Sequence, residues 1–387
     1  MSIYAGPEFN ESGLVYYHDM NNKKSYAGAP TTNYVTNADT MPGWNTYGGT
    51  PVAFRTEFGT TGYKMYNAPS WNGVYKAVSI PSTGIYTFSI WARYLGGSPN
   101  NNGGGVYISG WGGSDTASVT GRTQIGQWQR LSVTLNCTNT SMTFYCISWG
   151  GTNDGNSDRS SWEVTMPQVE AGSVATTWVN GSRSSTQVLR DLMGNHTIPA
   201  TSLTYNANNT FSFNGSTNKI TGTMPAAYTS SANTLGRSWE VIVRPSASLT
   251  TAGLFGHVTS SGCTYYCNGG VCIASGKYHF NWYDNSAYQF LDSGIVATNG
   301  QYAHIVGTWN PSDLKARIYV NGQLRATGAG TNLNYGGTSN EFQVGYFSAS
   351  GNPFAGTVDV AKYYYNKTMT DAEVFSNYTA VRLRYGI

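Results

Sequence analysis

The stretch QYAHIVGTWNPSDLKARIYVNGQLR, residues 301–325, decides the fold. Residues 303–309 are rich in β-branched and aromatic side chains, which favour an extended strand. Residues 310–313 (NPSD) end that strand, because proline fixes φ and the short polar side chains bond to their own backbone. Residues 315–320 alternate in polarity, and Asn321-Gly322 tolerates the positive φ values of a type I′ turn. The stretch therefore predicts antiparallel β-sheet.

The register of this hairpin has two interpretations. Ala316 and Ile318 share one face of the predicted strand, but a strict two-residue turn pairs Tyr319 on the other face with Leu324. Either the face that carries Tyr319 is covered as well, or a bulge shifts the register.

The same region resembles a known family. His304-Ile305-Val306, Trp309 and residues 318–322 (IYVNG) are similar to the central hairpin of laminin-G-like, concanavalin-A-like jelly rolls. Residues 354–374 (FAGTVDVAKYYYNKTMTDAEV) are similar to the last strand and short helix of such domains in tailed-phage structural proteins. The resemblance implies a jelly roll on the surface of a phage virion.

Composition independently favours β-structure and excludes several classes of protein. The 387 residues include 47 Gly, 29 Tyr and 11 Trp with only 11% charged side chains, which is typical of many short strands and tight turns. The net charge of +3 and the lack of a basic run argue against a nucleic-acid partner. The sequence has no run of the about 20 apolar residues that a membrane span needs, so no membrane insertion is predicted. The N-terminal residues predict no signal peptide.

The segments that resemble the jelly roll are separated in the chain. Residues 13–26 resemble its opening strand, yet the segment that should follow shortly, Leu189–Asn195 (LRDLMGN), comes well over a hundred residues later. The intervening part has its own strand and turn signals, and its ends resemble carbohydrate-binding-module jelly rolls. We therefore predict an all-β protein of two antiparallel β-sandwich jelly rolls, one (30–183) inserted into the other (1–29 plus 184–387).

One helix is predicted, at the C-terminus. Thr370 with Glu373 forms a capping box, and Val374, Tyr378 and Val381 share a face. We expect this short helix to cover a sheet edge or one end of a sandwich.

Motifs for catalysis are missing from the sequence. It contains no GxSxG, HExxH or P-loop pattern. His304 lies within a predicted strand, where a structural role is commoner than a catalytic one, and no spacing singles out a carboxylate pair for glycosidase chemistry. We predict that the protein is not an enzyme.

An internal echo predicts a sugar-binding platform. Residues 108–115 (ISGWGGSD) and 147–154 (ISWGGTND) both lead from a strand into Trp-Gly-Gly and then an acid. Pyranose rings stack on exposed aromatic rings while polar groups bind their hydroxyls. If the two strands end on the same side, the tryptophans flank a platform; the alternative is that both are core residues. The candidate sugar-binding residues are Trp111, Trp149, Asp115, Asp154 and Asp158.

Jelly rolls of this type often carry a structural Ca²⁺, which needs several oxygen ligands. Asp19, Glu57, Glu170 and Asp359 are the acids at family-like positions, and Glu57 and Glu170 are the candidate ligands, although none lies in a dense acidic loop. No other cofactor is predicted.

Aromatic residues are enriched in interface cores, so the run Tyr363-Tyr364-Tyr365 is a candidate subunit interface of a homo-oligomer. The five cysteines include Cys137 and Cys146, which flank a predicted hairpin, and the cluster Cys263, Cys267 and Cys272. With no CxxC pair, free thiols or one local disulfide fit them better than zinc.

These features predict a non-enzymatic structural component of a tailed-phage virion, a capsid decoration or tail fibre that adheres to glycans. A dedicated host-receptor-binding tail adhesin and a glycan-degrading enzyme are the alternatives. The expected partners are other capsid or tail proteins, further copies of the chain and host-surface polysaccharide. The expected location is the virion, assembled in the host bacterial cytoplasm.

Overall fold

The computed structural model describes residues 11–69, 71–97, 105–111, 116–121, 125–149, 159–198, 203–205, 211–223, 234–258, 269–284, 287–329, 341–347 and 351–387. Its contacts divide the chain into two compact units. The outer unit comprises Met1–Ala29 with Ser185–Asn206 and Thr210–Ile387, and the inserted unit comprises Pro30–Ser184. Within the described residues, no helix has both the length and the apolar character that a membrane span needs.

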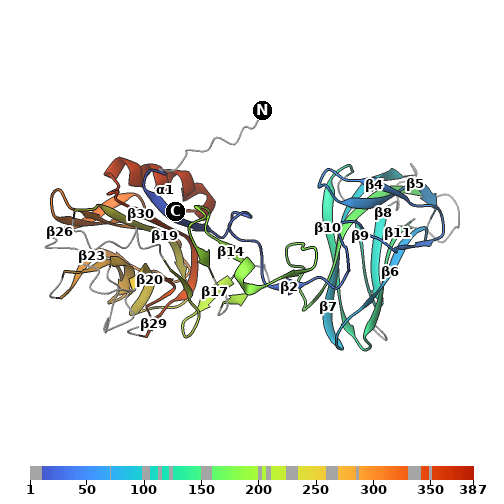
Figure 1. The fold of residues 1–387 in the computed structure, drawn as a ribbon, viewed down its shortest axis with the longest axis horizontal. Coiled ribbons are helices and arrows are strands. Elements are labelled where there is room, and N and C mark those ends of the chain that lie inside the picture. Colours follow the sequence, from blue (N-terminus) through green and yellow to red (C-terminus); the bar gives the residue numbers. More distant parts are fainter. Residues whose placement is uncertain are drawn as a thin grey trace. The chain divides into compact units, whose positions relative to one another are not determined.

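The outer unit is a sandwich of two antiparallel sheets, here called the helix-side sheet and the open-side sheet (Figure 1). The helix-side sheet runs in the order β16 (Thr204–Tyr205), β17 (Phe211–Asn214), β30 (Ala355–Tyr365), β19 (Arg237–Pro245), β24 (Ala303–Asn310), β25 (Lys315–Val320) and β26 (Gln323–Ala329), with β1 (Leu14–Asp19) also paired to β30. The open-side sheet runs in the order β18 (Ile220–Thr223), β27 (Glu341–Val344), β20 (Thr251–Val258), β21 (Gly269–Ala274), β22 (Lys277–Tyr283) and β23 (Tyr288–Val296).

The remaining elements of the outer unit are short apart from one helix. They are η1 (Ser185–Gln187), the pair β14 (Leu189–Arg190) and β15 (Thr197–Ile198), the pair β28 (Tyr346–Phe347) and β29 (Asn352–Pro353), and the helix α1 (Asp371–Tyr385). Apolar residues from the facing sides of both sheets, such as Trp239 of β19 and Phe280 of β22, form the core between them.

The predicted hairpin forms between β25 and β26, and both interpretations of its register hold. Asn321 and Gly322 adopt φ values of 52° and 75°, and Tyr319 pairs with Leu324. A bulge between Ile318 and Tyr319 shifts the register. Tyr319 is also covered: it is 1% exposed, whereas Leu324 is 44% exposed.

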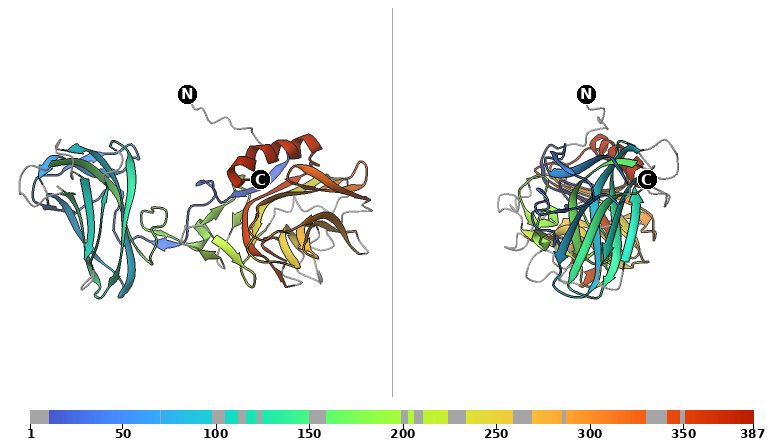
Figure 2. Two further views of the ribbon diagram at one scale, coloured as in Figure 1. Left: turned by 180° about the vertical axis from the view of Figure 1, so that it is seen from behind. Right: turned by 90° about the vertical axis from the view of Figure 1, so that its right-hand side faces the viewer.

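The cover over Tyr319 is α1. The Thr370 side chain caps the helix, and the reciprocal bond from Glu373 completes the predicted capping box. Figures 1 and 2 show α1 lying on the side of the helix-side sheet that faces away from β20. Val374 and Val381 of α1 pack in one cluster with Tyr319, so this sheet is buried on both faces.

The segment Leu189–Asn195 joins the two ends of the outer unit. A β-bridge links Tyr26 to Leu189, and the backbone N–H of Ala27 donates to the Val188 carbonyl at 2.8 Å. Asp191 Oδ1 accepts from the backbone N–H of Tyr17 at 2.9 Å. The chain therefore leaves the outer unit and re-enters it at neighbouring points.

The inserted unit is a second sandwich of antiparallel sheets. One sheet, here called the ionic sheet, runs in the order β10 (Trp128–Cys137), β7 (Gly84–Gly97), β12 (Arg159–Ala171), β5 (Thr61–Pro69) and β4 (Val52–Arg55). The other, here called the aromatic sheet, runs in the order β3 (Asn45–Tyr47), β6 (Gly73–Ser79), β11 (Ser141–Trp149), β8 (Gly105–Trp111) and β9 (Thr116–Gly121). The strands β2 (Thr31–Thr32) and β13 (Ser182–Arg183) pair where the unit begins and ends.

The core of the inserted unit lies between these sheets. Phe88 of β7 and Phe144 of β11 meet across it with ring centroids 4.2 Å apart. Cys137 and Cys146, which flank a predicted hairpin, instead lie on strands of different sheets; both are buried, and they form no disulfide with each other. The predicted all-β class, with sandwiches and a C-terminal helix, is confirmed.

The predicted interface at residues 363–365 is wrong for its first two tyrosines. Tyr363 is fully buried in the sandwich core, where its ring centroid lies 5.3 Å from that of Trp239. Tyr364 is fully buried on the other face, in the cluster that α1 covers. Tyr365 is half-buried and packs against the core. The sequence suggested an interface because β30 carries apolar rings on both faces; in the structure the sandwich core covers one face and α1 covers the other.

Candidate functional site

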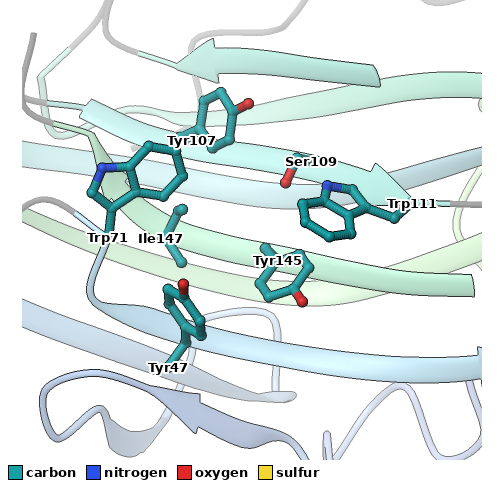
Figure 3. A pocket seen from close by; sticks show the side chains of 7 residues that line it. All are labelled: Tyr47, Trp71, Tyr107, Ser109, Trp111, Tyr145 and Ile147. Atoms are coloured by element: carbon teal, nitrogen blue, oxygen red, sulfur yellow. The ribbon is translucent and has the colours of Figure 1, made fainter. Parts of the chain in front are cut away.

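The outer side of the aromatic sheet carries the candidate site. Along β11, Phe144 and Cys146 point into the core, so Tyr145 and Ile147 face the other way. Ile108 of β8 likewise enters the core. The hollow on the outer side is lined by residues that we call the aromatic face, Tyr47, Trp71, Tyr107, Ser109, Trp111, Tyr145 and Ile147 (Figure 3).

Three rings of the aromatic face are well exposed. The exposed fractions are 55% for Trp111, 51% for Trp71 and 44% for Tyr47. Large apolar side chains gathered on one exposed surface mark binding sites more often than scattered ones do. The exposure is therefore the property that separates this face from the core.

The rings support one another. Tyr145 lies in the middle, with its ring centroid 5.6 Å from those of Tyr47 and Trp111. Tyr75 stacks on Tyr145 at 5.5 Å, and Trp71 meets Tyr107 edge-on at 6.2 Å. Tilted and edge-on contacts at these distances are favourable, so the rings are held in place before any ligand binds.

Register and a glycine keep the middle of the face open. Tyr47 and Ile147 both pair with Gly73, one on each side of β6. A Cβ at Gly73 would lie 2.0 Å from the carbonyl oxygen of Cys146, so the close approach of β6 to β11 requires glycine there. The missing side chain leaves space between Tyr47 and Ile147, in a hollow of about 430 Å³ that opens to solvent.

Trp71 is held in an unusual backbone conformation. Its φ is 66°, a region that bulky residues rarely adopt. The backbone N–H of Trp71 donates to the Ser148 carbonyl at 2.9 Å, and the N–H of Ser148 donates to the Asn72 carbonyl at 2.8 Å. These bonds fix Trp71 at the end of the hollow, and such strain is concentrated at functional sites.

The described residues that line the hollow are uncharged. Burial raises the pKa of Tyr145, and the neighbouring phenols of Tyr47 and Tyr75 raise it further. The phenol therefore stays neutral in physiological conditions and offers both a donor and an acceptor. With Ser109 and the indole N–H groups, the face presents neutral hydrogen-bonding groups among apolar rings.

The structure places the predicted platform residues differently from the sequence. Trp111 lies on the aromatic face, as the platform requires. The condition for the platform, that both strands end on the same side, is not met, because β8 and β11 are antiparallel: Trp111 pairs with Thr143, and Trp149 pairs with Gly105 at the other end of the ladder. The side chain of Trp149, and all of Asp115, Asp154 and Asp158, lie outside the described residues.

Sequence reasoning missed Tyr47, Trp71, Tyr107 and Tyr145. A signal existed in β8, where the rings of Tyr107 and Trp111 fall on the face opposite to that of Ile108. Alternation alone does not say which face is internal. Trp71 lies outside the strands, and no periodic pattern marks it.

The two predicted Ca²⁺ ligands do not form a site together. Glu57 lies in the turn between β4 and β5, where it accepts from Arg93 Nη1 at 3.0 Å and from Trp128. Glu170 pairs with Thr87, six residues from Arg93 along β7, which is roughly 20 Å at the rise of a strand.

Protein donors also occupy the oxygens of Glu170. Thr31 Oγ1 donates to Oε2 at 2.8 Å, while Gln168 Nε2 and the Thr176 backbone N–H donate to Oε1 at 2.6 and 2.8 Å. In the described part of the chain, no three His, Cys, Asp or Glu side chains are grouped as metal ligands.

No curated protein matches the chain. Among solved structures, it is similar to the botulinum neurotoxin serotype D binding domain (16% identity, TM-score 0.38, 52% of this chain and 50% of that chain). It is also similar to the receptor binding domain of the botulinum neurotoxin C/D mosaic serotype (18% identity, TM-score 0.39, 51% of this chain and 50% of that chain). The chain spans about half the length of these structures.

The sequence also matches a family model, that of the concanavalin A-like lectin/glucanases superfamily, over residues 214–375. This range includes the β24–β25–β26 region that decides the fold and the start of α1. The aromatic face lies outside it, in the inserted unit. The match therefore concerns the outer unit and not the inserted unit that carries the aromatic face.

Proposed function

We propose that the protein is a non-enzymatic glycan-binding protein and that the inserted unit binds sugar on its aromatic face. The observation that carries the proposal is the set of three exposed rings, Trp71, Trp111 and Tyr47, around an uncharged hollow. The lectin/glucanase family of the outer unit is a second support, because it associates this chain with carbohydrate recognition.

The chemistry of the face suits a sugar. A pyranose has an apolar C–H face that stacks on an aromatic ring, and its hydroxyls need donors and acceptors near the ring edges. The phenols of Tyr47, Tyr107 and Tyr145 and the hydroxyl of Ser109 provide such groups. The rings are positioned by contacts among themselves, so binding costs little ordering.

The test is binding of the full chain to an array of immobilised neutral and acidic glycans. We expect binding to neutral glycans that Trp111→Ala reduces about tenfold, the loss expected for one stacking contact. The matched control is Tyr66→Ala, which removes a ring that is 59% exposed on the other sheet of the same unit. Absence of binding to every glycan by folded protein would exclude the proposal.

The non-enzymatic part has its own test. Incubation with the glycans that bind, followed by a reducing-end assay, is expected to release nothing. Release of reducing ends would favour the glycan-degrading alternative.

The setting that we propose is the surface of a tailed-phage virion, as a capsid decoration or tail fibre in contact with other virion proteins and further copies of the chain. The support is the resemblance of residues 13–26, 189–195 and 354–374 to phage jelly rolls. These segments lie together in the outer unit, where β1 pairs with β30 and Asp191 binds the backbone of β1. Immunogold labelling of purified particles tests this setting, and unlabelled particles would exclude it.

A further inference from the structure

We propose that the ligand of the aromatic face is an uncharged glycan chain of several sugars that lies along β8 and β11. This inference rests on the proposed function and adds the class of the ligand. It comes from the position of Trp71 and Trp111 at opposite ends of one continuous, uncharged row of rings.

The first argument is length. Trp111 pairs with Thr143 of β11, whereas the backbone of Trp71 binds that of Ser148. Ser148 lies five positions after Thr143 on β11, so the two tryptophan backbones are about 17 Å apart along the strand. A single pyranose ring cannot contact both indoles, but a chain of sugars can.

The second argument is continuity between the two ends. Figure 3 shows Ile147 and Tyr145 between Trp71 and Trp111, with Ser109 beside them. Ile147 is 1% exposed and Ser109 is 6% exposed, so they form the floor of the hollow and not a barrier. A chain that runs from one indole to the other therefore crosses this floor and meets the ring of Tyr145 on its way.

The third argument is charge. None of the described residues that line the hollow is Asp, Glu, Lys or Arg. Lys76 of β6 lies on the same sheet, but its ammonium already donates to the carbonyls of Pro42 and Gly43 at 3.1 Å each. A carboxylate or sulfate bound here would lose water without gaining a cationic partner in the described part of the face. An uncharged sugar chain does not pay this cost, because it has no charged group to remove from water.

The strained backbone of Trp71 agrees with a specificity role for its ring. A tryptophan at φ 66° is strained relative to a relaxed residue. Its ring is 51% exposed, so the residue does not lie in the core of the unit. Contact between this ring and one end of a bound sugar chain would explain why a tryptophan is kept at this strained position.

The experiment is calorimetric titration of the full chain with sugar ladders. Neutral glucan, xylan and mannan series are used from the monosaccharide upward, with oligogalacturonates of matched length as the charged comparison. In at least one neutral series, we expect affinity to rise with length and level off once the chain spans both indoles. Monosaccharides and oligogalacturonates are expected to bind too weakly to measure.

Variants locate the two ends. Trp71→Ala and Trp111→Ala are each expected to lower the affinity for the longest bound chain about tenfold. Each is also expected to move the plateau to shorter chains, and Tyr66→Ala is expected to change neither property. A further readout needs no variant. In the unmodified protein, long sugar chains should reduce the quenching of tryptophan fluorescence by acrylamide, and short chains should not.

The outcomes separate the two proposals. Binding that is independent of length, or tighter for oligogalacturonates than for every neutral series, would overturn the present inference and leave glycan binding standing. Failure of all glycans to bind would overturn the proposed function itself, and this inference with it.

Discussion

Gly73 shows how one missing side chain shapes the candidate site. A Cβ there would lie 2.0 Å from the Cys146 carbonyl oxygen and 2.7 Å from Cα of Ile147. These are backbone atoms, which cannot turn aside as a flexible side chain can. The residue therefore determines both the spacing of β6 from β11 and the openness of the aromatic face.

We predict that Gly73→Ala destabilises the inserted unit by about 1–3 kcal/mol, the usual cost of overpacking. It should also weaken glycan binding, because the strands that carry the rings must separate. Differential scanning calorimetry and the glycan array measure the two effects. Ala77→Ser, an exposed change on the same strand, is the control and should leave both unchanged. An unaltered transition in Gly73→Ala would contradict the packing argument.

His18 is a second residue whose surroundings determine a measurable property. Its ring is fully buried in β1, with Nδ1 2.7 Å from the Tyr16 hydroxyl and Nε2 3.4 Å from the Val358 carbonyl oxygen. Burial lowers the pKa of His18 to about 4, although the nearby carboxylates of Asp19 and Asp191 act in the opposite direction. The imidazole is therefore neutral in the folded protein at neutral pH.

This lowered pKa predicts acid sensitivity of the outer unit. The unfolded chain binds the proton near pH 6.5, and the folded chain binds it only near pH 4. The contribution of His18 to stability is therefore complete above pH 6.5 and is lost as the pH falls toward 4, by about 3 kcal/mol.

Urea unfolding of the unmodified protein and of His18→Gln between pH 7 and pH 4 tests this dependence. The variant should show a shallower loss of stability as the pH falls, whatever its absolute stability at pH 7. Parallel pH profiles for the two proteins would contradict the assignment.

At the scale of elements, the docking of α1 depends on a buried ionic cluster. Glu240 of β19 is fully buried and accepts from Lys362 Nζ at 3.0 Å, the Tyr364 hydroxyl at 3.0 Å and Asn377 Nδ2 of α1 at 2.7 Å. His304 Nε2 lies 3.1 Å from the same carboxylate. Burial works to raise the pKa of Glu240, but the charge of Lys362 and the bond to His304 outweigh it and keep the carboxylate ionised.

We predict that Glu240→Gln destabilises the outer unit by about 3–5 kcal/mol, because it leaves the Lys362 ammonium buried without its counter-charge. The double variant Glu240→Leu with Lys362→Met removes both charges and should recover much of that loss. Chemical denaturation measures the stabilities, and limited proteolysis reports release of α1. A double variant that is less stable than Glu240→Gln would contradict this account.

The cap of α1 gives a smaller effect at the same scale. Thr370 Oγ1 accepts from the Glu373 backbone N–H, and the Glu373 side chain accepts from the Thr370 N–H at 2.8 Å. Thr370→Ala should therefore lower the free energy of unfolding by about 1 kcal/mol. Thr379→Ala, which removes a half-buried hydroxyl that donates to the Phe375 carbonyl within the same helix and leaves the cap intact, serves as the control in the same denaturation experiment and should have a much smaller effect.

At the scale of the whole molecule, each unit has a core of its own and the connection between them is short. In the outer unit, the Tyr26–Leu189 bridge and the Ala27–Val188 hydrogen bond join the segment before the insertion to the segment after it. The inserted unit closes at its ends through β2 and β13. Insertions between such neighbouring points are well tolerated.

We predict that deletion of residues 30–184, with a short glycine linker in their place, leaves the outer unit folded. Residues 30–184 alone should also fold, and should retain glycan binding because the aromatic face belongs wholly to them. Calorimetry of each piece and of the full chain measures this. Loss of cooperative unfolding in either piece would show that the units depend on each other.

Much of the fold could be predicted from the sequence because its signals are local. The Asn321-Gly322 turn, the alternation of residues 315–320 and the capping box at Thr370 all depend on neighbours along the chain, and all are confirmed. The strands of the inserted unit were recognised for the same reason, from their turns and side-chain types.

Which face of a strand is internal was decided only by the tertiary structure. A strand has two faces, and the pattern of alternating side chains does not say which of them is buried. The pairing of strands that are distant in the sequence decides this. Tyr363 and Tyr364 are both buried because α1 covers the second face of β30, while Tyr145 is left half-exposed because nothing described covers the aromatic sheet. The sequence by itself determined strands, turns, cap and the presence of Trp111. The tertiary structure decided that Trp71, which lies outside the strands, joins Trp111 on the hollow.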